Sequence, residues 1–69
     1  MERVQISMAA ARVNARMTQD EAAREMNVSK NTIVNWEKGK TSPTVPQARK
    51  LASIYRIPID YIFLPAVSN

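Results

Sequence analysis

The chain has 69 residues, a formal net charge of +4, and neither cysteine nor histidine. A chain of this length forms one domain with a marginal hydrophobic core. It lacks disulfides, thiolate and imidazole metal ligands and the commonest general base, and it has only six carboxylates. We therefore expect no metal site, no cofactor and no enzymatic activity.

No part of the sequence predicts a membrane segment or an export signal. No apolar run approaches the roughly 20 residues that span a bilayer. Charged residues interrupt the opening segment MERVQISMAAARV too early for a signal peptide. We expect a soluble, cytoplasmic protein with neither a membrane partner nor a small-molecule ligand.

The first predicted helix spans about residues 5–15. Helical spacing places four of its residues on one inward face: Met8, Ala9, Arg12 and Val13. Arg16 and Met17 then form a short connection to the next helix.

The second predicted helix spans residues 18–26. It begins at a capping box, because Thr18 is followed three residues later by Glu21. Its apolar stripe contains Ala22, Ala23 and Met26. Asn27 follows, and asparagine tolerates the left-handed backbone that often ends a helix.

The third predicted helix spans residues 29–38, between an N-cap at Ser29 and the chain's only glycine, Gly39. Successive residues are separated by about 100° around a helix. The inward side then holds Thr32, Ile33 and Trp36. The outward side holds Lys30, Asn31, Val34, Asn35 and Lys38.

A fourth helix is predicted over residues 45–55, after a capping box formed by Thr44 and Gln47. Its inward residues are Ala48, Leu51, Ala52 and Tyr55. A short fifth helix is predicted over about residues 59–64. No alternation typical of β-strands is visible. The fold class is therefore all-α, with five short helices around one core in a single domain.

The positive charge is concentrated in the middle of the chain. Residues 27–50 carry Lys30, Lys38, Lys40, Arg49 and Lys50 against Glu37 alone, whereas the segments before and after are each neutral. Such a patch is typical of a protein that binds a phosphate backbone. A surface that only improves solubility is the alternative interpretation.

The helices 18–26 and 29–38 have the arrangement that places a recognition helix in the DNA major groove. At these and neighbouring positions the chain resembles the phage-repressor-like, Xre-type helix-turn-helix family, over residues 5–64. The residues that carry the resemblance are Arg12, Met17, Thr18, Gln19, Ala22, Ala23, Met26, Val28, Ser29, Thr32, Ile33, Trp36, Glu37, Gly39, Lys40, Pro43, Leu51, Ala52 and Ile57. It implies a lambda-repressor-like domain in a regulator of transcription, with double-stranded DNA as its partner. Arg16, Asn27 and Arg56 stand where this family usually has glycine, and Pro58 where it usually has a Ser or Thr cap.

The outward side of the third helix supplies the candidate base contacts. Lys30 can donate to guanine, Asn31 and Asn35 can pair with adenine, and Val34 can pack against a thymine methyl group. The alternative is an ordinary solvated helix face with one tolerated surface valine.

Four further residues are candidates for phosphate contact: Thr18, Gln19, Lys38 and Lys40. The resemblance implies that Gln19 touches a phosphate and also braces the first side chain of the recognition helix. Capping by Thr18 and simple solvation of the lysines are the alternative interpretations.

Arg12 and Glu37 both face inward on their helical wheels, so we expect a structural ion pair between the first and third helices. Trp36 is expected in the core. A base-stacking role for Trp36 would require other exposed aromatic residues nearby.

Ile59, Tyr61, Phe63 and Leu64 crowd the short final helix, which cannot bury all four. We expect part of this surface to form a dimer interface, with a monomeric C-terminal core as the alternative. The sequence thus predicts a regulator, most closely a phage or mobile-element repressor, that binds a pseudo-palindromic operator as a homodimer. The alternative function is a protein-interaction module, such as an antitoxin or adaptor, that uses the same fold.

Overall fold

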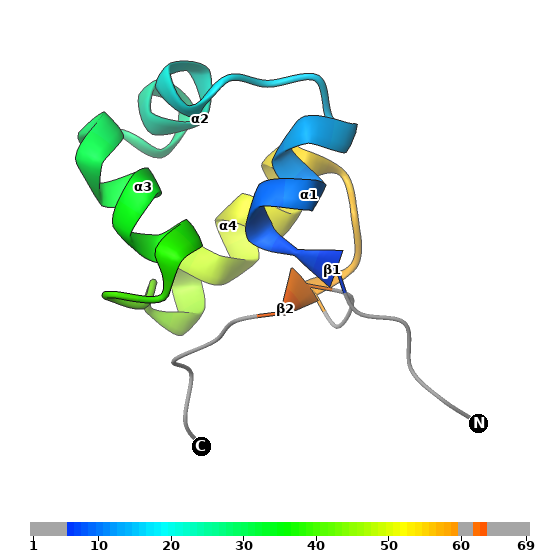
Figure 1. Cartoon of the computed structure of the whole chain (residues 1–69). Coiled ribbons are helices and arrows are strands. Elements are labelled where there is room, and N and C mark those ends of the chain that lie inside the picture. Colours follow the sequence, from blue (N-terminus) through cyan, green and yellow to red (C-terminus); the bar gives the residue numbers. More distant parts are fainter. Residues whose placement is uncertain (1–5, 60–61, 64–69) are drawn as a thin grey trace.

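The structure, a computed structural model, describes residues 6–59 and 62–63 of the chain. Within these ranges it contains four helices and two very short strands (Figure 1). In chain order these are β1 (Ile6–Ser7), α1 (Met8–Asn14), α2 (Gln19–Met26), α3 (Lys30–Lys38), α4 (Val45–Tyr55) and β2 (Ile62–Phe63). None of the described helices has the length and apolar character needed to cross a bilayer.

Each helix begins at a hydroxyl side chain that caps a backbone N–H group. The four N-caps are Ser7, Thr18, Ser29 and Thr44. Thr18 and Thr44 both form complete capping boxes, with Glu21 and Gln47 respectively, so these two sequence predictions are confirmed. An N-cap of this kind stabilises a helix by about 1 kcal/mol, which matters in helices of only two or three turns.

Residues with a left-handed backbone conformation end the helices or follow them closely. Asn27 (φ 60°), Gly39 (φ 77°) and Arg56 (φ 62°) cap α2, α3 and α4, and Arg16 (φ 60°) lies just after α1. Only glycine adopts this conformation without a steric penalty. The three non-glycine residues, Arg16, Asn27 and Arg56, are those that stand where the Xre-type family usually has glycine.

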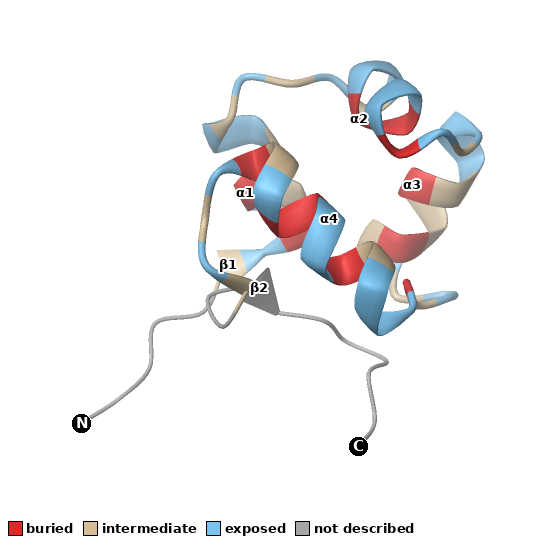
Figure 2. Ribbon diagram, turned by 180° about the vertical axis from the view of Figure 1, so that it is seen from behind, coloured by how far each residue is buried: buried red, intermediate tan, exposed pale blue. Residues whose placement is uncertain are grey.

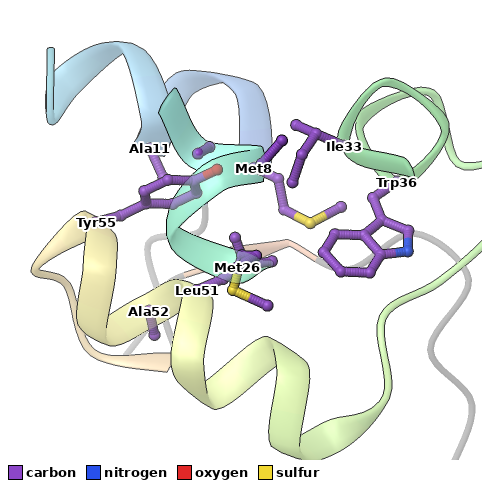
Figure 3. Close-up of a cluster of buried hydrophobic side chains, with 10 residues drawn as sticks. Met8, Ala11, Met26, Ile33, Trp36, Leu51, Ala52 and Tyr55 are labelled. Carbon is purple, nitrogen blue, oxygen red and sulfur yellow. The ribbon is translucent and has the colours of Figure 1, made fainter. Parts of the chain in front are cut away.

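The core is one cluster to which all four helices contribute, as Figures 2 and 3 show. Its members are Met8, Ala11, Ala22, Ala23, Met26, Ile33, Trp36, Leu51, Ala52 and Tyr55. Ile33 and Leu51 are almost completely buried, and burying such a side chain stabilises the fold by roughly 1.5–3 kcal/mol. Trp36 lies in this core as predicted.

The inward face of α1 differs from the predicted one. Val13 is 60% exposed, whereas Ala11 is completely buried. The helix begins at Met8, not at residue 5, and its buried stripe continues through Ala11 and the partly buried Arg12 and Ala15. The spacing of three and four residues along that stripe turns Val13 toward solvent.

The predicted fifth helix, residues 59–64, is wrong, and so is the expectation of no strands. Ile62 and Phe63 instead form β2, which pairs in parallel with β1, so that Ile6 lies opposite Ile62 and Ser7 opposite Phe63. Isoleucine and aromatic residues favour extended backbone, and an isolated helix of one or two turns is marginal. The strand pair also joins segments from the two ends of the chain, which no local sequence pattern can reveal.

Candidate nucleic-acid interface

The turn between α2 and α3 consists of Asn27, Val28 and Ser29. The left-handed Asn27 reverses the chain, and the N–H of Val28 donates to the carbonyl of Ala23 at 3.0 Å. Ser29 then caps α3 by accepting from the N–H of Thr32. α2 contributes the small buried residues Ala22 and Ala23 to the common core.

The outward side of α3 is exposed at both ends of the helix and partly accessible in the middle. Lys30, Asn31 and Lys38 are exposed, and Val34 and Asn35 are half-buried. Lys40, in the loop after α3, is also exposed.

Lys30 has one ionic neighbour among the described residues. Its Nζ atom lies 3.9 Å from Oδ2 of Asp20, and both side chains are well exposed. An exposed pair at this distance contributes at most about 1 kcal/mol. The ammonium group therefore remains available to a stronger partner.

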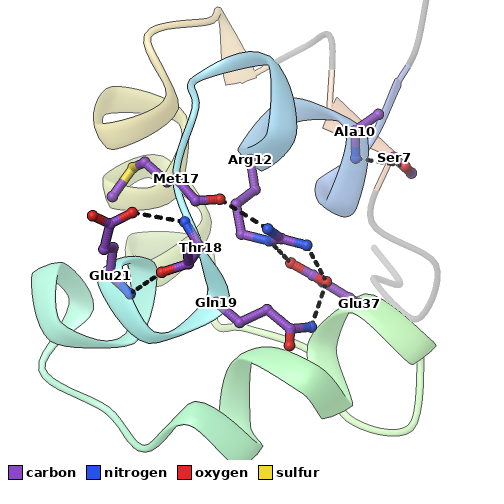
Figure 4. A network of polar contacts seen from close by, with 8 residues as sticks. All are labelled: Ser7, Ala10, Arg12, Met17, Thr18, Gln19, Glu21 and Glu37. Atoms are coloured by element: carbon purple, nitrogen blue, oxygen red, sulfur yellow. Dashed lines mark hydrogen bonds and ion pairs between the residues drawn. The ribbon is translucent and has the colours of Figure 1, made fainter.

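Behind this surface, Arg12 and Glu37 form an ion pair between α1 and α3 (Figure 4). Arg12 Nε lies 2.7 Å from Glu37 Oε2, and the two side chains are only 15% and 8% exposed. The Nη1 group of Arg12 also donates to the carbonyl of Met17 at 2.8 Å. One guanidinium thus holds α1, the connection after it and α3 together.

Gln19 completes this network. Its side-chain amide donates to Oε1 of Glu37 at 3.0 Å. The resemblance implied that Gln19 braces the first side chain of α3, but the structure brings it to the last turn of that helix. Neither this contact nor the Met17 carbonyl was foreseen from the sequence, because a backbone acceptor or a polar pair 18 residues apart has no local signature.

The network has electrostatic consequences for its members and for Tyr55. The hydrogen bond to Glu37 raises the pKa of Arg12 above its usual value. The pKa of Tyr55 is raised to about 12, chiefly by burial and also by the negative charge of Glu37, while the positive charge of Arg12 opposes the rise. Arg12 remains charged and Tyr55 neutral throughout the physiological pH range.

The residues predicted for a dimer interface are only partly described. Ile59 is half-buried and packs against the domain's own core. Phe63 lies in β2, and its side chain is not described, while Tyr61 and Leu64 lie outside the described residues. Within the described part of the chain, no group of three acidic side chains could hold a metal ion.

Comparison with known proteins gives the family. The sequence model of a helix-turn-helix family matches residues 8–62, which include all four helices. The chain belongs to this helix-turn-helix family. This family is the Xre-type group of DNA-binding transcriptional regulators, which the sequence resembles.

Several relatives of this helix-turn-helix protein are regulators by name. An uncharacterized HTH-type transcriptional regulator of Archaeoglobus fulgidus is 40% identical over 53 residues, which cover 77% of this chain and 75% of the relative. The cryptic phage CTXphi transcriptional repressor RstR of Vibrio cholerae is 42% identical over 58 residues, covering 84% of this chain and 52% of RstR. The regulator ImmR of Bacillus subtilis is 35% identical over 52 residues, covering 75% of this chain and 41% of ImmR.

The helix-turn-helix protein thus spans about half the length of RstR and less than half that of ImmR. No solved structure gives a significant match to it.

Proposed function

We propose that this protein regulates transcription by binding double-stranded DNA in a sequence-specific manner, as a repressor of the phage or mobile-element kind. The observation that carries the proposal is the accessible outward side of α3, which bears lysine and asparagine side chains in a helix-turn-helix. The concentration of positive charge in residues 27–50 and the relative named as a phage repressor support it. With DNA as its target, the protein acts in the cytoplasm.

In the proposed complex, α3 lies in the major groove and reads base edges. Lys30 donates to guanine O6 and N7, and Asn31 and Asn35 pair with adenine N6 and N7. Val34 packs against a thymine methyl group. The support is that these four residues lie on the accessible side of one helix.

The proposed phosphate contacts gather near the C-terminal end of α3, where Gln19 of α2 reaches Glu37. Thr18 and Gln19 lie at the N-terminus of α2, where free backbone N–H groups attract anions. Lys38, in the last turn of α3, and Lys40, in the loop after it, are exposed. Gln19 can bind Glu37 and a phosphate at the same time, because one N–H of its amide donates to Glu37 and the second is available to the phosphate.

The proposed binding unit is a dimer on a pseudo-palindromic operator. One helix in one segment of groove makes a small interface of roughly 600–1,000 Å², which favours two copies on a duplex. The C-terminal residues Ile59, Tyr61, Phe63 and Leu64 are the proposed contact. Since Ile59 packs partly on its own core, the other three carry most of that contact.

Selection of bound duplexes from a random DNA pool tests the proposal. We expect enrichment of two inverted half-sites whose centres lie about one helical turn apart, roughly 34–36 Å. Sedimentation of the selected complex should then give two chains per duplex. Failure to bind any duplex even at low salt would overturn DNA binding and favour the protein-interaction alternative.

A further inference from the structure

A second accessible surface lies between the C-terminal ends of α1 and α4. A groove there has a floor of four half-buried apolar residues that also border the core: Ala15, Met17, Ile54 and Ile57. Figures 1 and 2 show these helix ends on the side of the molecule away from α3. We call this surface the α1/α4 groove.

Two exposed arginines flank the apolar floor. Arg16 follows α1 and Arg56 caps α4, and both line the groove. None of the described residues that line it is acidic, and neither arginine forms an ion pair with a described residue. The α1/α4 groove therefore combines an apolar floor with two rim arginines, although Glu21 and Glu25 lie near Arg16 on its other side.

The backbone at both arginines makes this combination costly to maintain. Arg16 and Arg56 have φ values of 60° and 62°, a conformation in which glycine avoids the steric penalty of a Cβ atom. A cation near a helix C-terminus interacts favourably with the helix dipole, which accounts for one charge at each end. It does not account for the apolar groove between the two charges.

We propose that the α1/α4 groove binds a short acidic segment of a partner protein, with carboxylates paired to Arg16 and Arg56 and an apolar side chain on the floor. The planar guanidinium matches a carboxylate with two parallel hydrogen bonds. The half-buried isoleucines give the segment's apolar side chain a surface that excludes water.

The same features argue against two other occupants. A phosphate backbone gains nothing from the apolar floor. A second copy related by two-fold symmetry would place its own Arg16 and Arg56 against this pair, because such an interface joins identical surfaces. None of the residues that line the groove belongs to α3, so a partner bound there leaves the outward side of the recognition helix accessible.

Selection from a displayed library of random peptides tests the proposal on the full chain. We expect the enriched peptides to share at least two Asp or Glu residues around a bulky apolar residue. A synthetic copy of the best peptide should bind Arg16→Gly and Arg56→Gly about tenfold more weakly or worse, the loss expected for a charged hydrogen bond. Glycine suits the left-handed conformation, so both variants should retain the fold, which a thermal melt verifies.

Arg49→Ala is the matched control, because Arg49 is an exposed arginine of α4 outside the groove. The peptide should bind this variant as it binds the wild type. An equal loss in Arg49→Ala, or displacement of the peptide by random duplex DNA, would mean unspecific attraction to a basic protein and would overturn the proposal. Enrichment of no acidic peptide, or self-association of the chain that is lost in Arg16→Gly, would overturn it as well.

Discussion

The side-chain amide of Gln19 donates a hydrogen bond to Oε1 of Glu37, while Arg12 holds Oε2 of the same carboxylate. Gln19 is the first residue of α2, and Glu37 lies in the last turn of α3. The bond therefore spans the helix pair, and both carboxylate oxygens are engaged (Figure 4). A change in the angle between α2 and α3 would break at least one of these bonds.

Replacement of Gln19 by Ala should lower the free energy of unfolding by roughly 1–2 kcal/mol. The reason is that Glu37 loses one charge-assisted hydrogen bond but keeps its partner Arg12. Urea unfolding measures the effect, with Glu25→Ala as the control on an exposed position of α2. That control should change stability by less than about 0.5 kcal/mol. Equal stabilities of the two variants would show that the Gln19–Glu37 bond does not stabilise the helix pair.

Arg12→Ala should be more severe, with a loss of roughly 3–5 kcal/mol. It leaves the nearly buried carboxylate of Glu37 without its cation and the carbonyl of Met17 without its donor. In a domain of this size such a loss removes most of the stability. A thermal melt of Arg12→Ala that matches the wild type would contradict a stabilising role for the pair.

Asn31→Ala and Asn35→Ala test the proposed base contacts. Each lost bidentate contact should cost on the order of 1–3 kcal/mol at the selected operator, with much less change on random duplex. The two affinities are measured at the same salt concentration, because non-specific binding depends strongly on salt. Equal losses on operator and random DNA would move these asparagines out of the base-reading role.

Lys38→Ala and Lys40→Ala should behave differently, because phosphate contacts carry no sequence information. We expect a similar loss on every duplex and a salt dependence whose logarithmic slope falls by about one per variant. Arg24→Ala provides the control, since Arg24 is an exposed cation on α2 outside the proposed contacts. An unchanged slope in a lysine variant would place that side chain away from the backbone.

The helix-turn-helix pair was predictable because its signals are local. The cap at Thr18, the left-handed Asn27 and the final Gly39 each follow from one residue type and its near neighbours. The pairing of Arg12 with Glu37 also followed from helical wheels, since both charges lie on inward faces.

The ends of the domain were not predictable in the same way. The strand pair joins Ile6 to Ile62, and such a long-range contact overrides the weak local preference of a short helix. The exposure of Val13 depends on which side of α1 the other helices cover, because Met8 and Arg12 can share a buried stripe with either Ala11 or Val13. The partners of Gln19 and of the Met17 carbonyl likewise depend on tertiary packing.

The last prediction concerns the phenol of Tyr55, which is almost completely buried in the core. Burial raises its pKa to about 12 in the folded protein, whereas an unfolded chain titrates tyrosine near about 10. Between these two values the unfolded chain has lost the proton and the folded chain keeps it. Unfolding then releases a proton, so the free energy of unfolding falls as pH rises through this window.

Below the lower value both states are protonated, and Tyr55 contributes no pH dependence. The full effect of Tyr55 is at most roughly 2–3 kcal/mol, because each pKa unit corresponds to about 1.4 kcal/mol. The effect is measured by urea unfolding of the wild type and of Tyr55→Phe at several pH values from about 9 to about 12, a range that includes the pKa of tyrosine in the unfolded and in the folded chain. All other ionisable groups are common to both proteins, so only the wild type should show the additional fall. Parallel pH profiles would mean that Tyr55 ionises in the folded state as easily as in the unfolded chain.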